Sequence, residues 1–272
     1  ISFSARNRRA FSFDTLLLAT DGSAPEGAPH GTFGWVLASQ SSILLTGYGV
    51  VHGNPLSSYR AEAVGLLAGI LAFDTLLQYT NCNSSPSIDG YLDSKGVHDV
   101  ITDMGNTSTP ISWSRRPDPD AIFQLWHTRR QVSFPVTTYW IPSHQDRTAP
   151  HADLPWPAIL HIKADELATL ARRHYSHSRP PPFIPFPQGG PTLFHRDRPR
   201  TSHYTSLLRE APQRDRLRTY LLQRWEWTPP QYDELAWDCY RTARSTASFP
   251  MIRFATKHLI GWLPTKSLLS KY

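Results

Sequence analysis

Four carboxylate residues stand where the chain could hold divalent metal ions: Asp21, Glu62, Asp93 and Asp165. Asp21 and Asp93 each end a short apolar run, so both are expected at the ends of strands. Converging carboxylates repel one another unless cations lie between them, and hard oxygen ligands favour Mg²⁺ or Mn²⁺ over zinc. Two such ions about 3.5–4 Å apart are the usual device for displacement at a phosphodiester.

Each of these positions also has an ordinary explanation. An Asp-Gly pair such as Asp21-Gly22 is usually a turn, and a Glu early in a helix complements the helix dipole. An Asp-Ser pair before a helix, as at Asp93-Ser94, is usually a cap. The metal-site hypothesis therefore depends on the joint order of the four residues and on their local context.

The elements that would position these side chains follow from the hydrophobic pattern. Short apolar runs predict strands, and apolar residues spaced by three and four predict helices. The predicted strands cover 15–20, 33–39, 43–51, 87–92 and 136–141, and the predicted helices cover 59–79, 94–104, 119–131 and 158–174. Three strands followed by alternating helices and strands predict an α/β fold with a mixed sheet covered by helices.

Five short motifs in this order resemble the ribonuclease H family over residues 14–175. They are Thr20-Asp21-Gly22-Ser23, Tyr59-Arg60-Ala61-Glu62, Leu92-Asp93-Ser94, Trp140-Ile141-Pro142-Ser143-His144 and Lys163-Ala164-Asp165-Glu166-Leu167-Ala168. The resemblance implies a ribonuclease H-like fold, a five-stranded mixed sheet flanked by helices. It implies an endonuclease that hydrolyses the RNA strand of RNA/DNA hybrids with two Mg²⁺ ions, for which Mn²⁺ can substitute.

The resemblance also assigns roles to individual residues. One ion would be held by Asp21, Asp93 and Asp165 and would activate water, and the other would be held by Asp21, Glu62 and Asp93. His144 corresponds to the family's mobile-loop histidine, which acts in proton transfer and product release. The stretch of 21 residues from His144 to Asp165 is longer than the family usually has.

Other residues near the motifs are candidates for substrate contact. Four of them are Gly22, Ser23, Ser94 and Arg60. The two serines could meet a phosphate or a 2′-hydroxyl, or cap local structure; Arg60 is expected to be substrate-side or on the surface. His161 is interpreted as a surface or packing residue, and Trp126 and Trp140 as core residues.

Composition and charge divide the chain. Residues 1–175 have a net charge of −2 and residues 176–272 a net charge of +8, which favours a polyanionic partner. We expect a linker at 1–13, a ribonuclease H-like domain at 14–175, a proline-rich linker at 176–192 and a basic helical region at 193–272. Residues 253–265 resemble the helical segment that follows ribonuclease H in non-LTR retroelement and related reverse-transcriptase polyproteins, so an upstream reverse transcriptase domain is expected.

Two other functions stay open at this point. The same fold could serve a nuclease or transposase that acts on DNA, or an inactive nucleic-acid-binding connector domain. Two cysteines cannot make a disulfide framework, which favours an intracellular protein. The longest nearly apolar stretch has 11 residues, so no membrane association is expected.

Overall fold

The computed structural model describes residues 15–80, 86–104, 117–147, 149–177, 180–189, 193–195, 198–202 and 204–234, together with 242, 247–248 and 250–251. The chain divides into two compact units, Ile1–Tyr204 and Thr205–Tyr272. The predicted N-terminal linker at 1–13 and the family-like segment at 253–265 lie outside the described residues.

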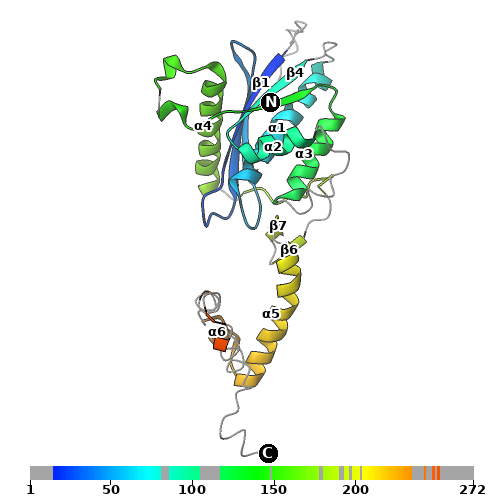
Figure 1. The fold of residues 1–272 in the computed structure, drawn as a ribbon, viewed down its shortest axis with the longest axis vertical. Coiled ribbons are helices and arrows are strands. Elements are labelled where there is room, and N and C mark those ends of the chain that lie inside the picture. The colour runs from blue at the N-terminus through cyan, green and yellow to red at the C-terminus, as the bar shows by residue number, and fades with distance from the viewer. Residues whose placement is uncertain are drawn as a thin grey trace, which may run out of the picture. The chain divides into compact units, whose positions relative to one another are not determined.

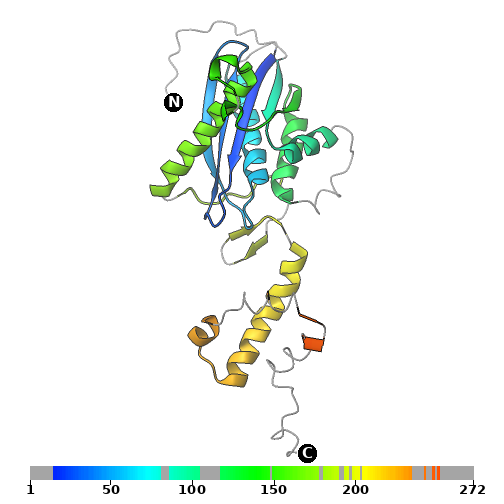
Figure 2. The same cartoon turned by 60° about the vertical axis from the view of Figure 1, so that its left-hand side comes forward.

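A five-stranded mixed sheet forms the centre of the first unit, with the strand order β3-β2-β1-β4-β5 (Figure 2). Its strands are β1 (Thr15–Ser23), β2 (Gly31–Ala38), β3 (Ile43–Val51), β4 (Ser87–Leu92) and β5 (Val136–Trp140). β1, β2 and β3 pair in antiparallel fashion, whereas β4 runs parallel to β1 and β5 runs parallel to β4. The parallel pairs bring the ends of β1 and β4 to one edge of the sheet.

Helices cover both faces of this sheet, as Figure 1 shows. They are α1 (Ser58–Thr80), α2 (Lys95–Met104), α3 (Pro119–Gln131) and α4 (Trp156–His177). α4 lies on one face, and α1, α2 and α3 lie on the other (Figure 1). The predicted fold class, a five-stranded mixed sheet flanked by helices, is confirmed.

The alternation of side chains along the strands separates two cores. Leu16 and Leu18 of β1 point to the larger core, which they share with α1, α2 and α3, whereas Leu17 and Ala19 point to the core under α4. α1 packs through its apolar residues into the larger core. It is also the one helix of the described residues that is long and apolar enough to cross a membrane, a test that buried core helices pass as well.

The structure differs from the sequence prediction at the first motif. β1 continues to Ser23, and Asp21 pairs with Gly34 of β2, so Asp21-Gly22 is extended strand and not a turn. The prediction also missed a two-stranded hairpin, β6 (Leu193–His195) with β7 (Arg198–Arg200), because three-residue strands leave almost no periodic signal.

The proline-rich segment packs on the first unit over its described residues. His52 Nε2 lies 2.8 Å from the carbonyl oxygen of Pro181, and the Gln188 backbone N–H donates to the side-chain oxygen of Gln124 at 2.9 Å. Farther along, the Thr201 hydroxyl donates to the carbonyl oxygen of Pro55 at 2.7 Å. These hydrogen bonds hold Pro181, Gln188 and Thr201 against the rest of the unit.

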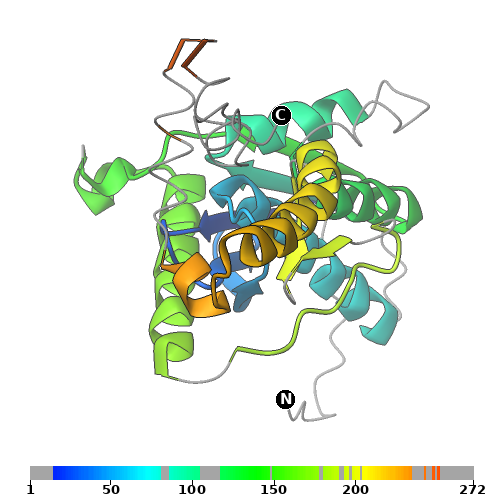
Figure 3. The same ribbon diagram turned by 90° about the horizontal axis from the view of Figure 1, so that it is seen from below.

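The second unit begins with a long helix. α5 (Tyr204–Trp225) is seen from yellow to orange in Figure 3, and the short α6 (Pro229–Asp233) follows it. Both helices lie in the region 193–272, which was expected to be basic and helical. Beyond residue 234, the structure describes only 242, 247–248 and 250–251 of that region.

Candidate metal centre

The parallel pairing of β1 and β4 brings two of the predicted carboxylates together. Ala19 pairs with Tyr91, so Asp21 and Asp93 follow at matching distances along the two strands. Ala19 and Tyr91 both pack on the α4 side of the sheet, and the two-residue period directs Asp21 and Asp93 to that side as well. One ligand atom of Asp21, one of Asp93 and one of His161 all lie within 4.8 Å of one another.

α4 adds the third carboxylate. Asp165 makes a side-chain hydrogen bond with Asp21 and adds its negative charge to that of Asp93. Burial, and then the charges of Asp93 and Asp165, raise the pKa of Asp21 to about 7. In the absence of cations the cluster therefore binds a proton near neutral pH, which is the behaviour of carboxylates that repel one another.

Glu62 reaches the same cluster from α1, on the opposite face. Its side chain is 1% exposed, and one carboxylate oxygen, Oε1, accepts a hydrogen bond from the Thr20 hydroxyl at 2.9 Å. Burial, followed by the charges of Asp21 and Asp93, raises the pKa of Glu62 well above its usual value. Asp21 thus interacts with each of the other three predicted carboxylates.

Gly22 explains how α1 comes so close to β1. A Cβ atom at Gly22 would lie 2.6 Å from the carbonyl carbon of Ala61 and would also clash with the backbone nitrogen of Glu62. Only glycine leaves space for this contact. The close approach carries Glu62 to the end of β1, where its carboxylate lies near that of Asp21.

The donor set fits a hard divalent cation. The second oxygen of Glu62, Oε2, and the Nε2 atom of His161 are buried, and neither has a hydrogen-bond partner among the described residues. Buried polar atoms are normally paired because an unpaired one costs about 1–3 kcal/mol. A cation among these side chains would neutralise the carboxylates and give both atoms a partner.

Two residues of this region were missed from the sequence. His161 is 5% exposed and belongs to the cluster, although it was interpreted as a surface or packing residue. The available signal was its spacing, because His161 precedes Asp165 by four residues and shares its face of α4. Burial lowers the pKa of His161, against the nearby charges of Asp93 and Asp165.

Trp140 was predicted to be a core residue, and this prediction is wrong. Its side chain is 48% exposed, and its indole N–H donates to the backbone carbonyl of Asp93 at 2.9 Å. Alternation along β5 would place Trp140 on the buried side with Val136 and Thr138, but it is the last residue of the strand and is exposed there. The indole therefore lies beside the cluster and holds the chain that carries Asp93.

The remaining predicted contacts lie around the cluster. His144 is exposed, has a left-handed backbone with φ of 49°, and lies close enough to His161 to lower the pKa of that imidazole. Ser94 accepts a hydrogen bond from the backbone N–H of Val97 at 3.4 Å, so it caps α2. Ser23 is the last residue of β1 and is partly exposed.

Arg60 does not have the position predicted for it. The sequence analysis expects a substrate-side or surface residue, but Arg60 is 1% exposed. Its guanidinium donates to both carboxylate oxygens of Asp120, at 2.7 and 2.8 Å, and to Asp118 at 3.4 Å. The α1 backbone turns this side chain toward α3, where the two aspartates neutralise it, so the substrate-contact prediction for Arg60 is wrong.

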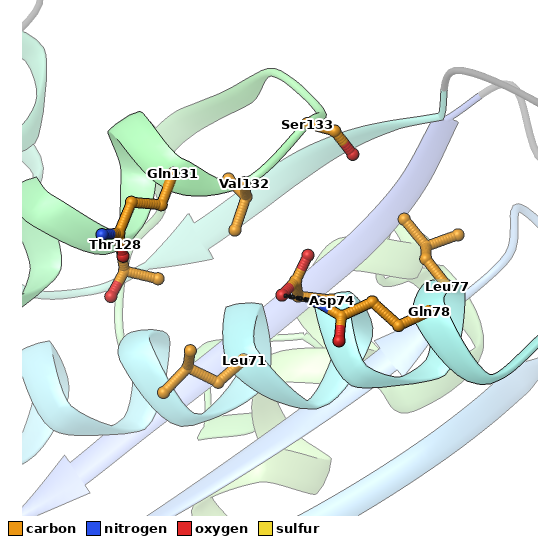
Figure 4. A pocket seen from close by; sticks show the side chains of 8 residues that line it. All are labelled: Leu71, Asp74, Leu77, Gln78, Thr128, Gln131, Val132 and Ser133. Carbon is orange, nitrogen blue, oxygen red and sulfur yellow. Dashed lines mark hydrogen bonds between the residues drawn. The ribbon is translucent and has the colours of Figure 1, made fainter.

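Two hollows on the first unit lie apart from the carboxylate cluster. One hollow of about 480 Å³ lies between α1 and α3, where Leu71, Asp74 and Thr128 contribute to its lining (Figure 4). Another, of about 420 Å³, is lined by His30, His52 and the proline-rich segment. Neither hollow is lined by a residue of the cluster.

Among known proteins, only solved structures are found to be similar to this chain. No family model matches the chain, and no curated protein matches it in sequence. One similar solved structure is the ribonuclease H1 of Halobacterium salinarum, with 18% identity, a TM-score of 0.40, and coverage of 59% of this chain and 98% of that chain.

Two further neighbours differ in context. The LC11 ribonuclease H1 in complex with an RNA/DNA hybrid has 13% identity and a TM-score of 0.43, covering 59% of this chain and 99% of that one. The prototype foamy virus protease-reverse transcriptase has 16% identity and a TM-score of 0.36, covering 57% of this chain and 20% of that one.

Proposed function

We propose that this chain is a metal-dependent endonuclease of the ribonuclease H type, which hydrolyses the RNA strand of RNA/DNA hybrids. The observation that carries the proposal is the convergence of Asp21, Glu62, Asp93 and Asp165 from two strands and two helices. A purely structural cluster of this kind would be strongly destabilising, because like charges in a partly buried site repel. Bound cations would offset this repulsion, which accounts for the cluster.

The four carboxylates would hold two Mg²⁺ ions, with Mn²⁺ as a substitute. When bound, the ions supply an activated water and neutralise charge that develops on the leaving oxygen. Asp21 and Asp93 would form the middle of this site. Glu62 of α1 would complete it on one side and Asp165 of α4 on the other. Thr20 orients the Glu62 carboxylate through its hydroxyl, and Trp140 fixes the backbone at Asp93.

The groups around the cluster would meet the nucleic acid. Ser23 and the Gly22 backbone stand beside Asp21, and a 2′-hydroxyl is the group by which a protein distinguishes RNA from DNA. Exposed His144 would exchange a proton with the leaving group and assist product release. We further propose that this domain belongs to an intracellular reverse-transcribing element, downstream of a reverse transcriptase domain.

The test is cleavage of a labelled RNA/DNA hybrid with Mg²⁺ or Mn²⁺, alongside single-stranded RNA, duplex RNA and duplex DNA. Asp93→Asn removes one carboxylate charge of the cluster and keeps the side-chain shape. Asp99→Asn is the matched control, because Asp99 is an exposed residue of α2. We expect hybrid cleavage by the unchanged protein and by Asp99→Asn, and a loss of more than about 100-fold in Asp93→Asn.

Other outcomes point elsewhere. Cleavage of duplex DNA in preference to the hybrid would favour a DNA nuclease or transposase on this fold. A folded protein that neither cleaves any substrate nor binds Mn²⁺ would favour a connector domain. Equal hybrid cleavage by Asp93→Asn and the unchanged protein would remove the carboxylate cluster from the mechanism.

A further inference from the structure

The imidazole of His161 has no explanation in a site made of carboxylates alone. His161 is a residue of α4, its side chain is 6% exposed, and its Nε2 atom has no hydrogen-bond partner among the described residues. A histidine that only filled space in the core would be expected to pair this nitrogen. His161 thus carries a free ligand atom in an enclosed position.

The residues around this nitrogen are the metal ligands of our proposed function, and this inference therefore rests on that proposal. The Nε2 atom lies 3.9 Å from the Oδ1 atom of Asp93, and a ligand atom of Asp21 lies within 4.8 Å of both. A distance of 3.9 Å is too long for a hydrogen bond. Two metal–ligand bonds of about 2.1 Å can span up to about 4.2 Å, so one ion can contact both atoms.

The geometry of α4 also places His161 beside the proposed metal ligands. His161 and Asp165 are four residues apart in α4, so their side chains project from one face of the helix. Ala164, between them, packs under the sheet in the core shared with β1 and β2. α4 therefore delivers a nitrogen ligand and an oxygen ligand together to the side of the sheet on which Asp21 and Asp93 lie.

We propose that His161 is a metal ligand, and that its imidazole makes one of the two positions a mixed nitrogen and oxygen site that prefers Mn²⁺ to Mg²⁺. Mg²⁺ is bound almost entirely by oxygen, whereas imidazole nitrogen suits first-row transition ions. Within that series affinity at a given site rises from Mn²⁺ to Cu²⁺ and falls again at Zn²⁺, which still binds more tightly than Mn²⁺, so Zn²⁺ competes for this position and Mg²⁺ does so weakly.

The direct test is electron spin-echo envelope modulation of Mn²⁺ bound to the full chain, which detects nitrogen coordinated to the ion. We expect a ¹⁴N modulation in the unchanged protein, absent from His161→Asn. Mn²⁺ affinity, measured by calorimetry, should fall at least about tenfold in His161→Asn, and Mg²⁺ affinity should change less, because nitrogen contributes little to Mg²⁺ binding.

Two control variants test whether His161, and not another histidine, supplies the coordinated nitrogen. His151→Asn changes an exposed residue outside the cluster and should keep the modulation. His144→Asn tests the neighbouring histidine, and loss of the modulation there with its survival in His161→Asn would overturn the proposal. His161→Gln is a second variant for the case in which His161→Asn does not fold, and circular dichroism checks both.

The outcomes also separate this inference from the proposed function. If Mn²⁺ binds to the unchanged protein and to His161→Asn with equal affinity and no nitrogen signal, His161 is not a ligand, and the carboxylate site stands. If the unchanged protein binds no Mn²⁺ at all, both the His161 assignment and the two-ion site are wrong.

Discussion

Arg60 and Asp120 form a two-pronged ion pair inside the first unit, with nitrogen–oxygen distances of 2.7 and 2.8 Å. Both residues are buried, at 1% and 4% exposure. The pair joins α1 to the first turn of α3. Since Arg60 precedes Glu62 by two residues, it anchors the same helical turn that presents this carboxylate to the cluster.

Removing Arg60 should destabilise the protein strongly. Arg60→Leu leaves Asp118 and Asp120 buried without their cation, and breaking a buried pair in this way costs about 3–5 kcal/mol. Lys163→Ala is the control, because its pair with Glu166 is exposed and is worth at most about 1 kcal/mol. Urea unfolding measures both free energies. A loss below about 1 kcal/mol in Arg60→Leu would show that the pair does not stabilise the fold.

His144→Ala should slow turnover without abolishing it. The residue is exposed beside the cluster, so its loss removes a proton carrier but no proposed metal ligand. We expect a reduction of about 10- to 100-fold in the multiple-turnover rate on the hybrid. His151→Ala is the matched control on an exposed histidine. Unchanged multiple-turnover kinetics in His144→Ala would end the role proposed for this side chain.

The stability of the metal-free protein should depend on pH through Asp21. Its pKa is 3.8 in the unfolded chain and about 7 in the folded protein. Between these values the folded protein holds a proton that the unfolded chain has lost, so the free energy of unfolding falls as pH rises from about 4 to about 7. Above about pH 7 this contribution is constant.

Chemical unfolding in EDTA across this range checks the pH dependence, with Asp21→Asn as the reference that cannot titrate. We expect the unfolding free energy of the unchanged protein, relative to that of Asp21→Asn, to fall as pH rises over this range and to level off above it. Added Mg²⁺ at pH 8 should stabilise the unchanged protein more than the variant. Parallel curves for the two proteins would contradict the raised pKa of Asp21.

The second unit should strengthen hybrid binding through charge. Residues 205–272 hold 11 Lys and Arg against 6 Asp and Glu, a net charge of +5. Deletion after Tyr204 keeps the whole first unit, including Gln188 and Thr201 with their hydrogen bonds to Gln124 and Pro55. The shortened chain should bind the hybrid more weakly, with a flatter dependence of log K on log salt, measured by fluorescence anisotropy between 50 and 200 mM salt. An identical salt slope would show that these residues do not contact phosphates.

Hydrophobic periodicity was enough to predict the sheet and its helices. The runs at 15–20 and 87–92 are long enough to fix strands, and the three-and-four spacing fixes α1. Periodicity could not predict the buried ion pair, because the partners of Arg60 are about 60 residues away in the chain. The orientation of Arg60 depends on where α3 packs, which the local pattern does not contain.

The sequence predicted only part of the candidate site. The four carboxylates are brought together as expected, because the ends of neighbouring parallel strands meet at one edge of the sheet. His161 was missed because a single histidine in a helix has no motif of its own. Trp140 was placed in the core on its size, whereas its position at the very end of β5 leaves it exposed.

Gly22 and Gly34 have a joint consequence for the dimensions of the cluster. A Cβ at Gly22 would meet the backbone of α1, and a Cβ at Gly34 would lie 2.7 Å from the Cβ of Leu167 in α4. At these two positions, one on each face, no strand side chain separates the sheet from the helix that packs on it. Ca²⁺ needs ligand distances of about 2.3–2.6 Å against about 2.0–2.1 Å for Mg²⁺. If the cluster binds metal as proposed, these main-chain contacts would limit how far the helices can move apart, and we expect the site to prefer Mg²⁺ to the larger Ca²⁺.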